Sequence, residues 1–155
     1  LALEYLLEKP EQERPNFLIH PGISAVQIAA SRIGSPLTND FCVISLSDRL
    51  TPWLTIKKRI IASAEGDFVV AFYNPKSNDR HWQLKSAIEI LLEYRPVDTP
   101  VVFAREVGRA SEDIKTYTLD KLPLEEVDML TIVIVGNSKS KVSGQWFLTP
   151  RGYLN

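Results

Sequence analysis

Residues 41–73 read FCVISLSDRLTPWLTIKKRIIASAEGDFVVAFY and carry the pattern that decides the fold. The first six residues are almost continuously apolar, which is typical of a strand buried on both faces. Thr51 and Pro52 follow, a hydroxyl cap before a proline at the first helical position, and they predict a helix over 51–64. A second apolar run, 67–73, predicts another buried strand. The stretch is therefore a strand–helix–strand unit.

The same alternation continues on both sides of this unit. Helical apolar spacing predicts helices, and short apolar runs bounded by turn residues predict strands. The predicted strands span 16–20, 41–46, 67–73, 100–105, 114–119 and 130–136, and the predicted helices span 1–9, 23–33, 51–64 and 81–94, with a turn or short helix over 122–127. The chain is thus expected to be an α/β protein with a mixed, mostly parallel sheet of about five strands flanked by helices. No helix separates 100–105 from 114–119, so that pair is expected to be antiparallel.

The start of the chain bears on its domain organisation. Leu1 opens a helical pattern with no capping residue before it, which indicates further residues upstream. We therefore expect 1–20 to be the end of a preceding domain with its linker, 21–140 an α/β domain, and 141–155 a tail that the sequence does not assign.

Composition excludes several classes of function. The net charge is −1, without the clustered basic excess of a nucleic-acid or anionic-membrane surface. The single cysteine, Cys42, excludes an internal disulfide. No apolar run approaches the ~18 residues that span a membrane, and we expect a cytoplasmic protein. The two histidines, His20 and His81, have no cysteine partners at metal-binding spacing, so no metal site is expected.

Familiar catalytic motifs, the Walker loop, GxGxxG, GxSxG and HExxH, are absent from the sequence. The candidate residues are therefore sought in the loops at strand ends, where ligand-binding sites lie in α/β sheets. Ser24 opens a helix, whose first N–H groups are unpaired and attract electron-rich atoms, although capping alone explains a serine there. Pro75 is expected to hold Asn74 extended, in a loop that either faces a ligand or only turns the chain. Gly108 lets a backbone approach a ligand closely, and a simple turn explains it equally well.

Three segments together resemble a known family. PGISAVQIAASRIGSPLTNDFCVISLSDRLTPW, residues 21–53, resembles a stretch of the precorrin-3B (carbon-17) methyltransferases, a subgroup of the tetrapyrrole methylases, in which a PGI-x-A turn leads to DF-x-VISLSD-x-LTPW. Residues 66–77, GDFVVAFYNPKS, resemble the family's ADFVVA-x-YNP-x-S, and residues 125–138 its EEVDM-x-T-x-VIVG-x-S. The resemblance covers residues 18–140.

The resemblance implies a two-domain α/β protein with S-adenosylmethionine folded in the cleft between the domains. Cofactor contacts in the family come largely from backbone atoms of strand-end loops. Carried over by motif, the implied cofactor-binding residues are Ser24, Ala25, Asn74, Gly108 and Thr131, the last on the resemblance alone. The family's glycine- and proline-rich loop and its GD-x-G-x-YGMA loop are absent here, so half of the cofactor site is expected to lie outside this chain.

The implied activity is methylation of precorrin-3B at ring carbon 17 with ring contraction, giving precorrin-4 in cobalamin biosynthesis. The implied partners are the tetrapyrrole substrate and a second copy of the protein in a homodimer. Ring contraction needs acid–base help, for which Asp48 and His81 are the titratable loop residues to test first. Two alternatives stay open: another methylase of the same pathway, or a non-catalytic dimerisation or ligand-binding module of a fused protein.

Overall fold

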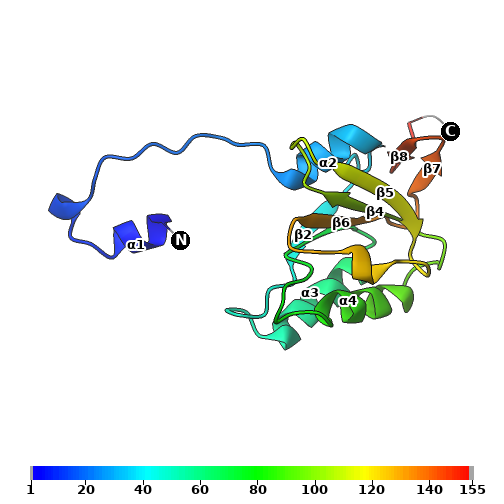
Figure 1. Cartoon of the computed structure of the whole chain (residues 1–155), viewed down its shortest axis with the longest axis horizontal. Helices are drawn as coiled ribbons and strands as arrows, with labels where there is room; N and C mark the ends of the chain where they lie inside the picture. Colours follow the sequence, from blue (N-terminus) through cyan, green and yellow to red (C-terminus); the bar gives the residue numbers. More distant parts are fainter. Residues whose placement is uncertain (1, 154–155) are drawn as a thin grey trace.

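The computed structural model describes residues 2–153 and shows an α/β body preceded by a separate N-terminal segment (Figure 1). Its helices are α1 (Ala2–Leu7), α2 (Ala25–Ile33), α3 (Trp53–Glu65) and α4 (Gln83–Leu92), with 3-10 turns η1 (Glu11–Glu13) and η2 (Leu124–Glu126). Its strands are β1 (Gly34–Ser35), β2 (Phe41–Ser45), β3 (Val69–Tyr73), β4 (Pro100–Arg105), β5 (Asp113–Thr118), β6 (Thr131–Val135), β7 (Lys141–Ser143) and β8 (Trp146–Leu148).

Five strands form the main sheet, in the order β2-β3-β6-β4-β5. The α/β class, the mixed sheet and the antiparallel β4–β5 pair are confirmed. The expectation of a mostly parallel sheet is wrong, because only β2 and β3 pair in parallel and the other neighbouring pairs are antiparallel. The reason is the direction of β6: the segment 119–130, which contains η2, carries the chain back across β4, so β6 runs in the same direction as β5 and antiparallel to both β3 and β4. Strand β6 then enters between β3 and β4 in the opposite direction.

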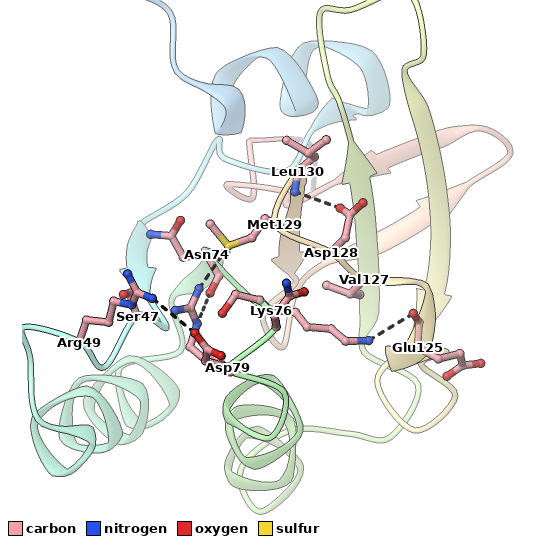
Figure 2. Close-up of a pocket in the computed structure, with 13 residues that line it drawn as sticks. Ser47, Arg49, Asn74, Lys76, Asp79, Glu125, Val127, Asp128, Met129 and Leu130 are labelled. Atoms are coloured by element: carbon pink, nitrogen blue, oxygen red, sulfur yellow. Dashed lines mark hydrogen bonds and ion pairs between the residues drawn. The ribbon is translucent and has the colours of Figure 1, made fainter.

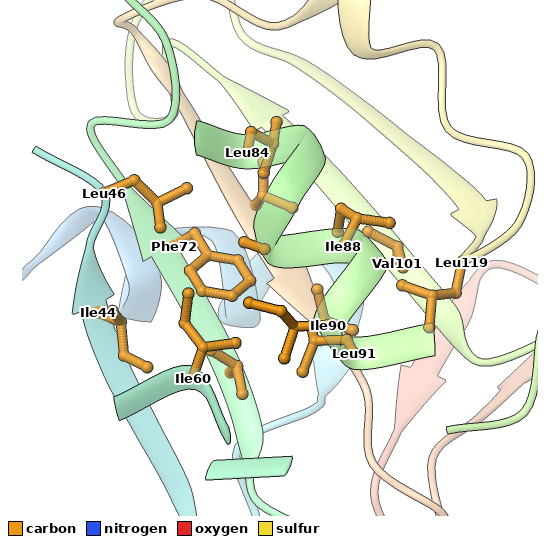
Figure 3. Packing of buried hydrophobic residues seen from close by; sticks show 14 of the residues in the cluster. Ile44, Leu46, Ile60, Phe72, Leu84, Ile88, Ile90, Leu91, Val101 and Leu119 are labelled. Carbon is orange, nitrogen blue, oxygen red and sulfur yellow. The ribbon is translucent and has the colours of Figure 1, made fainter. Parts of the chain in front are cut away.

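Helices cover both faces of this sheet (Figure 1). Side chains alternate across a strand, so Val70 and Phe72 of β3 face α3 and α4, while Val69 and Ala71 face α2. Figure 3 shows Phe72 on the first face, directed toward Ile60 of α3 and the apolar side of α4. Burial on both faces explains why the central strands are apolar throughout.

Helix α3 departs from its predicted start. It begins at Trp53, and Pro52 instead of Thr51 occupies the cap position without a side-chain hydrogen bond. The predicted threonine cap is therefore wrong, although the helix itself is confirmed. Proline at the cap still suits the position, because the missing N–H would have no helical partner. Among residues 2–153, no helix combines the length and the apolar character needed to cross a bilayer.

A second, smaller sheet of order β1-β8-β7 lies beside the body. Strand β8 pairs in parallel with β1 and forms a hairpin with β7. Gly34 is necessary in β1, since its φ is +128° and a Cβ there would lie 2.7 Å from the Phe147 carbonyl oxygen. Phe147 itself is buried in the core beneath α2. Residues 141–148, which the sequence left unassigned, thus contribute to this core, while the domain division at 140 stays a prediction.

The N-terminal segment does not form the predicted strand at 16–20. Residues 14–24 run without regular structure, and α1 and η1 lie away from the sheet (Figure 1). Phe17, Leu18 and Ile19 are exposed. Their apolar sequence resembles a strand, but this segment has no neighbouring strand to take up its backbone N–H and carbonyl groups. The helix expected over 1–9 forms over the shorter span of α1, and Leu1 lies outside the described residues.

Candidate functional site

One edge of the main sheet gathers most of the candidate residues. Ser45 pairs with Tyr73, and Arg105 pairs with Thr131, so the ends of β2, β3 and β4 meet the start of β6 at this edge. The loops that begin at Asn74 and Glu106 therefore leave the sheet beside the loop that enters β6. The sheet brings Asn74, Gly108 and Thr131 to one edge, although they are far apart in the sequence.

Ser24 and Ala25 lie at the start of α2. Ser24 is the cap residue of this helix, and its N–H donates to Oε1 of Gln27 at 2.9 Å. Ala25 is the first helical residue and is exposed. The helix packs beside the loop after β4, since a Cβ at Gly108 would lie 3.4 Å from Cδ1 of Ile28. The structure thus supports the capping interpretation of Ser24 and leaves Ala25 open to solvent.

Asn74 does not have the extended backbone expected before a proline. Its φ is +52°, in the left-handed region, which asparagine tolerates better than most residues. The side-chain Nδ2 donates to Oγ of Ser45 at 3.3 Å, and the carbonyl oxygen accepts from Nε of Arg80 at 3.2 Å. The expectation of an extended conformation is wrong, because these two tertiary contacts hold the turn in another one.

The turn after β4 has the same unusual backbone. Glu106 and Gly108 have φ values of +50° and +78°. The Gly108 N–H donates to Oε2 of Glu112 at 2.6 Å, and Ser111 Oγ donates to the Glu106 carboxylate. A glycine is therefore required for the turn itself. Its exposed face still admits close backbone approach, since only Ile28 lies within 4 Å of a built Cβ.

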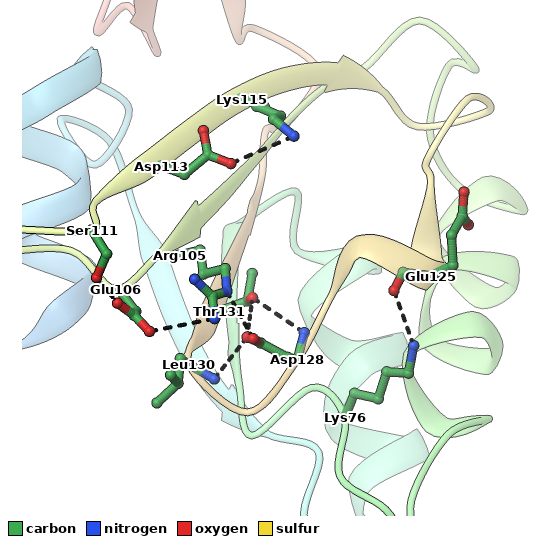
Figure 4. A network of polar contacts seen from close by, with 10 residues as sticks. All are labelled: Lys76, Arg105, Glu106, Ser111, Asp113, Lys115, Glu125, Asp128, Leu130 and Thr131. Carbon is green, nitrogen blue, oxygen red and sulfur yellow. Dashed lines mark hydrogen bonds and ion pairs between the residues drawn. The ribbon is translucent and has the colours of Figure 1, made fainter.

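Thr131 is buried and belongs to a network around Asp128 (Figure 4). Its hydroxyl donates to Oδ1 of Asp128 at 2.8 Å, and the same oxygen accepts from the Leu130 N–H at 3.0 Å. Arg105 Nε donates to Oδ2 at 2.7 Å. Burial raises the pKa of the Asp128 carboxyl, but these hydrogen bonds outweigh burial and hold that pKa below its usual value. The Thr131 hydroxyl is thus committed to shaping the loop.

The two acid–base candidates lie beside the start of α4. Asp48 follows β2, and its Oδ2 accepts from Nε2 of Gln83 at 2.9 Å. Gln83 is buried at the first residue of α4, two residues after His81. His81 is exposed in the preceding loop. Asp48 is therefore positioned by a neutral donor, and its second carboxylate oxygen is left for another partner.

A pocket of about 890 Å³ opens at the same edge, between the loop over 74–80 and the loop over 125–130 (Figure 2). Asn74 lines it, together with Lys76 and Arg80 from its own loop and Met129 from the other. Asn74 was predicted from the sequence, whereas Lys76, Arg80 and Met129 were not. The available signal was the pair of cationic side chains just after the Asn74-Pro75 turn. The facing loop was not recognisable as a partner before β6 was placed between β3 and β4.

Exposed apolar side chains accompany these polar groups. Tyr73 at the end of β3, Met129 and Leu130 before β6, and Ile23 before α2 are all largely exposed. A nucleoside ring or a tetrapyrrole face needs such apolar contact beside a few placed polar groups. This edge of the sheet offers an open glycine turn and neighbouring apolar side chains. The residues present therefore fit one face of a bound S-adenosylmethionine. In the part of the chain that the structure describes, no group of three acidic, histidine or cysteine side chains is arranged for a metal ion.

The mixed five-stranded sheet and the loops gathered at its edge define an α/β domain with its candidate site at strand ends. The profile described as Tetrapyrrole (Corrin/Porphyrin) Methylases matches residues 2–123. The chain belongs to this family.

Individual relatives narrow the likeness. A protein of Salmonella typhimurium named probable cobalt-factor III C(17)-methyltransferase is 47% identical over 86% of this chain and 55% of its own length. A Sinorhizobium protein named precorrin-3B C(17)-methyltransferase is 43% identical over 92% of this chain and 58% of its own. The crystal structure of the methyltransferase CobJ superposes with a TM-score of 0.89 at 40% identity, covering 96% of this chain and 62% of that one. The chain thus spans somewhat more than half the length of these relatives.

Proposed function

We propose that the chain forms part of an S-adenosylmethionine-dependent methyltransferase that methylates precorrin-3B at ring carbon 17, with ring contraction to precorrin-4, in cobalamin biosynthesis. The observation that carries this proposal is the 43–47% identity to C(17)-methyltransferases across nearly the whole chain. That similarity favours this reaction over those of other tetrapyrrole methylases. The Salmonella relative's name favours a second candidate substrate, the cobalt-containing cobalt-factor III.

Ser24, Ala25, Asn74, Gly108 and Thr131 are the residues that we assign to the cofactor. The bound cofactor supplies a methyl group on a sulfonium, whose charge disappears as the methyl leaves. The protein's task is therefore alignment, and positioning of this kind contributes roughly 7–11 kcal/mol in well-oriented reactions. The left-handed turns at Asn74 and Glu106 support this role, because such backbone is held at a cost that functional sites commonly bear.

Asp48 is the residue that we assign to proton transfer during ring contraction, with His81 as the alternative. Asp48 lies after β2 and has one oxygen held by Gln83, which fixes the direction of the other. We also propose a cytoplasmic homodimer, in keeping with the resemblance to the family. The size of the protein in solution tests the homodimer. A pH–rate profile of the Asp48→Asn variant tests the proton transfer.

The test of the proposed function uses the full-length protein. Incubated with methyl-labelled S-adenosylmethionine and either precorrin-3B or cobalt-factor III, it should release a product that carries one additional methyl group at carbon 17. S-adenosylhomocysteine should bind in calorimetry. Binding with no methyl transfer to either substrate would favour a non-catalytic module, and methylation at another carbon would favour another methylase of the pathway.

Gly108→Val tests the cofactor assignment within the same protein. A branched side chain blocks close backbone approach, so S-adenosylhomocysteine should bind at least about tenfold more weakly, or about 1.4 kcal/mol. The matched control is Gly144→Val, in the β7–β8 turn, where φ is also positive at +59° and nothing lies within 4 Å of a built Cβ. Equal affinity in both folded variants would leave Gly108 as a turn residue only.

A further inference from the structure

Arg80 brings a buried positive charge to the pocket between 74–80 and 125–130. The residue is 5% exposed and lines the pocket. Its Nε donates to the Asn74 carbonyl oxygen at 3.2 Å, and its Nη2 contacts the Met129 sulfur at 3.3 Å. Within residues 2–153, no carboxylate forms an ion pair with it. A buried guanidinium whose partners are only a carbonyl and a thioether is far from neutralised.

Lys76 and Arg49 add two further cations to the lining of the same pocket. Lys76 Nζ donates only to carbonyl oxygens, those of Leu124 at 3.4 Å and Glu125 at 3.3 Å (Figure 2). Arg49 lies 3.5 Å from Asp79, and both side chains are exposed. An exposed pair of this kind is weak and yields readily to a competing anion.

The acidic residues that line the pocket do not neutralise the charge of these cations. Asp128 already accepts from Arg105, Thr131 and the Leu130 N–H. Asp79 and Glu125 are exposed, so water screens their charges. The pocket therefore holds one desolvated cation and a second cation without a carboxylate partner among the described residues. Electrostatics at this site favours an incoming anion.

We propose that this pocket binds a carboxylate, and we assign it to an acid side chain at the periphery of the tetrapyrrole substrate. This inference rests on the proposed function. Arginine holds a carboxylate through paired hydrogen bonds, which selects for orientation as well as charge. The exposed Met129 and Leu130 at the rim supply the apolar surface against which the macrocycle packs. The pocket sets the position of the ring relative to the strand-end loops.

The methyl donor also carries a carboxylate, on its amino-acid part, so the experiment measures two affinities. In the full-length protein, Lys76→Met and Arg49→Gln should each weaken tetrapyrrole binding roughly fivefold, equivalent to about 1 kcal/mol, and their combination should weaken it further. Binding of S-adenosylhomocysteine should be unchanged. Lys58→Met, at an exposed position of α3 outside the pocket, is the matched control and should bind both ligands like the parent.

A substrate analogue with amidated side chains completes the test. The parent should bind it more weakly than the acid, and Lys76→Met should cause no additional loss, because the charge that Lys76 meets is gone. Arg80→Lys retains the charge but not the paired hydrogen-bond donors; if that variant does not fold, the substitutions at Lys76 and Arg49 still decide between the outcomes.

Each outcome separates the pocket from the proposed function. If the parent binds both ligands and the pocket variants bind like the parent, the pocket assignment is wrong and the proposed function stands. Loss confined to S-adenosylhomocysteine would move the carboxylate to the methyl donor and overturn the assignment to the tetrapyrrole. A parent protein that binds neither ligand would overturn both.

Discussion

At the scale of single residues, Arg80 and Arg95 show what burial of a guanidinium can mean. Arg95 is as buried as Arg80, but it lies among backbone carbonyls, donating to those of Phe68 and Gly136. Burial lowers the pKa of Arg95, with nearby Asp67 opposing the shift. Arg95 therefore ties the start of β3 to the end of β6, whereas Arg80 faces a pocket. The same residue type serves structure at one place and a candidate site at the other.

Asp128 gives a prediction for pH dependence at the same scale. Its pKa is lowered in the folded protein, so its contribution to stability is present above the unfolded value near 3.9 and is lost as the pH falls through the folded value. Asp128→Asn should therefore lose less stability than the parent between pH 5 and pH 2. The side chain is 42% exposed, so the difference should stay below about 1 kcal/mol.

Urea unfolding at pH 6 and pH 2.5 measures this difference. The matched control is Asp98→Asn, an exposed position after α4, which should retain the parent's loss. If the Asp128→Asn variant loses as much stability in acid as the parent, the hydrogen-bond network around Asp128 does not depend on the charge of that residue.

At the scale of elements, the small sheet is the feature that ties the end of the chain to the body. Strand β8 places Phe147 under α2, where it is 1% exposed and packs with Val26 and Ile33. The neighbouring Trp146 is 50% exposed on the opposite face of the strand. Strand alternation alone thus separates a core residue from a surface one.

Phe147→Ala should lower the free energy of unfolding by about 3–5 kcal/mol, the cost of removing a buried phenylalanine and leaving a cavity. Trp146→Ala, the neighbouring control, should cost far less, because half of that side chain is already in water. Chemical denaturation of both variants gives the comparison. Equal effects would mean that β7 and β8 do not contribute to the core as a unit.

At the scale of the whole molecule, the chain corresponds to part of the length of its relatives and exposes several apolar side chains. It spans 55% and 58% of the two C(17)-methyltransferase relatives and 62% of the CobJ structure. Ile23 is exposed just before α2, and Phe17, Leu18 and Ile19 are exposed in the segment that precedes it. Burial of such surface normally requires another part of the protein or a partner.

We therefore expect the 155-residue chain by itself to transfer no methyl group, whereas the full-length protein does. Both are assayed at equal concentration with methyl-labelled S-adenosylmethionine and precorrin-3B. A cooperative thermal transition of the isolated chain is the necessary control, because it shows that inactivity does not come from unfolding. Comparable rates from the two proteins would contradict the prediction.

The sequence by itself determined the elements and the class of fold. The spans of the main strands and helices, the antiparallel β4–β5 pair and the strand-end positions of Asn74 and Gly108 all follow from periodicity and turn residues, which act over a few positions. The resemblance to the tetrapyrrole methylases was also recognisable in continuous segments of the sequence, and the match to the family profile confirms it.

Only the tertiary structure decided how these pieces meet. The place of β6 between β3 and β4, the strands within 141–148, the left-handed turn at Asn74 and the pocket beside Arg80 each depend on contacts between segments far apart in the chain. A local sequence pattern cannot show such contacts, because the identity of a residue does not indicate which distant residue its backbone N–H or its charged side chain will contact. An apolar run such as 16–20 illustrates the point: it becomes a strand only where another strand takes up its hydrogen bonds.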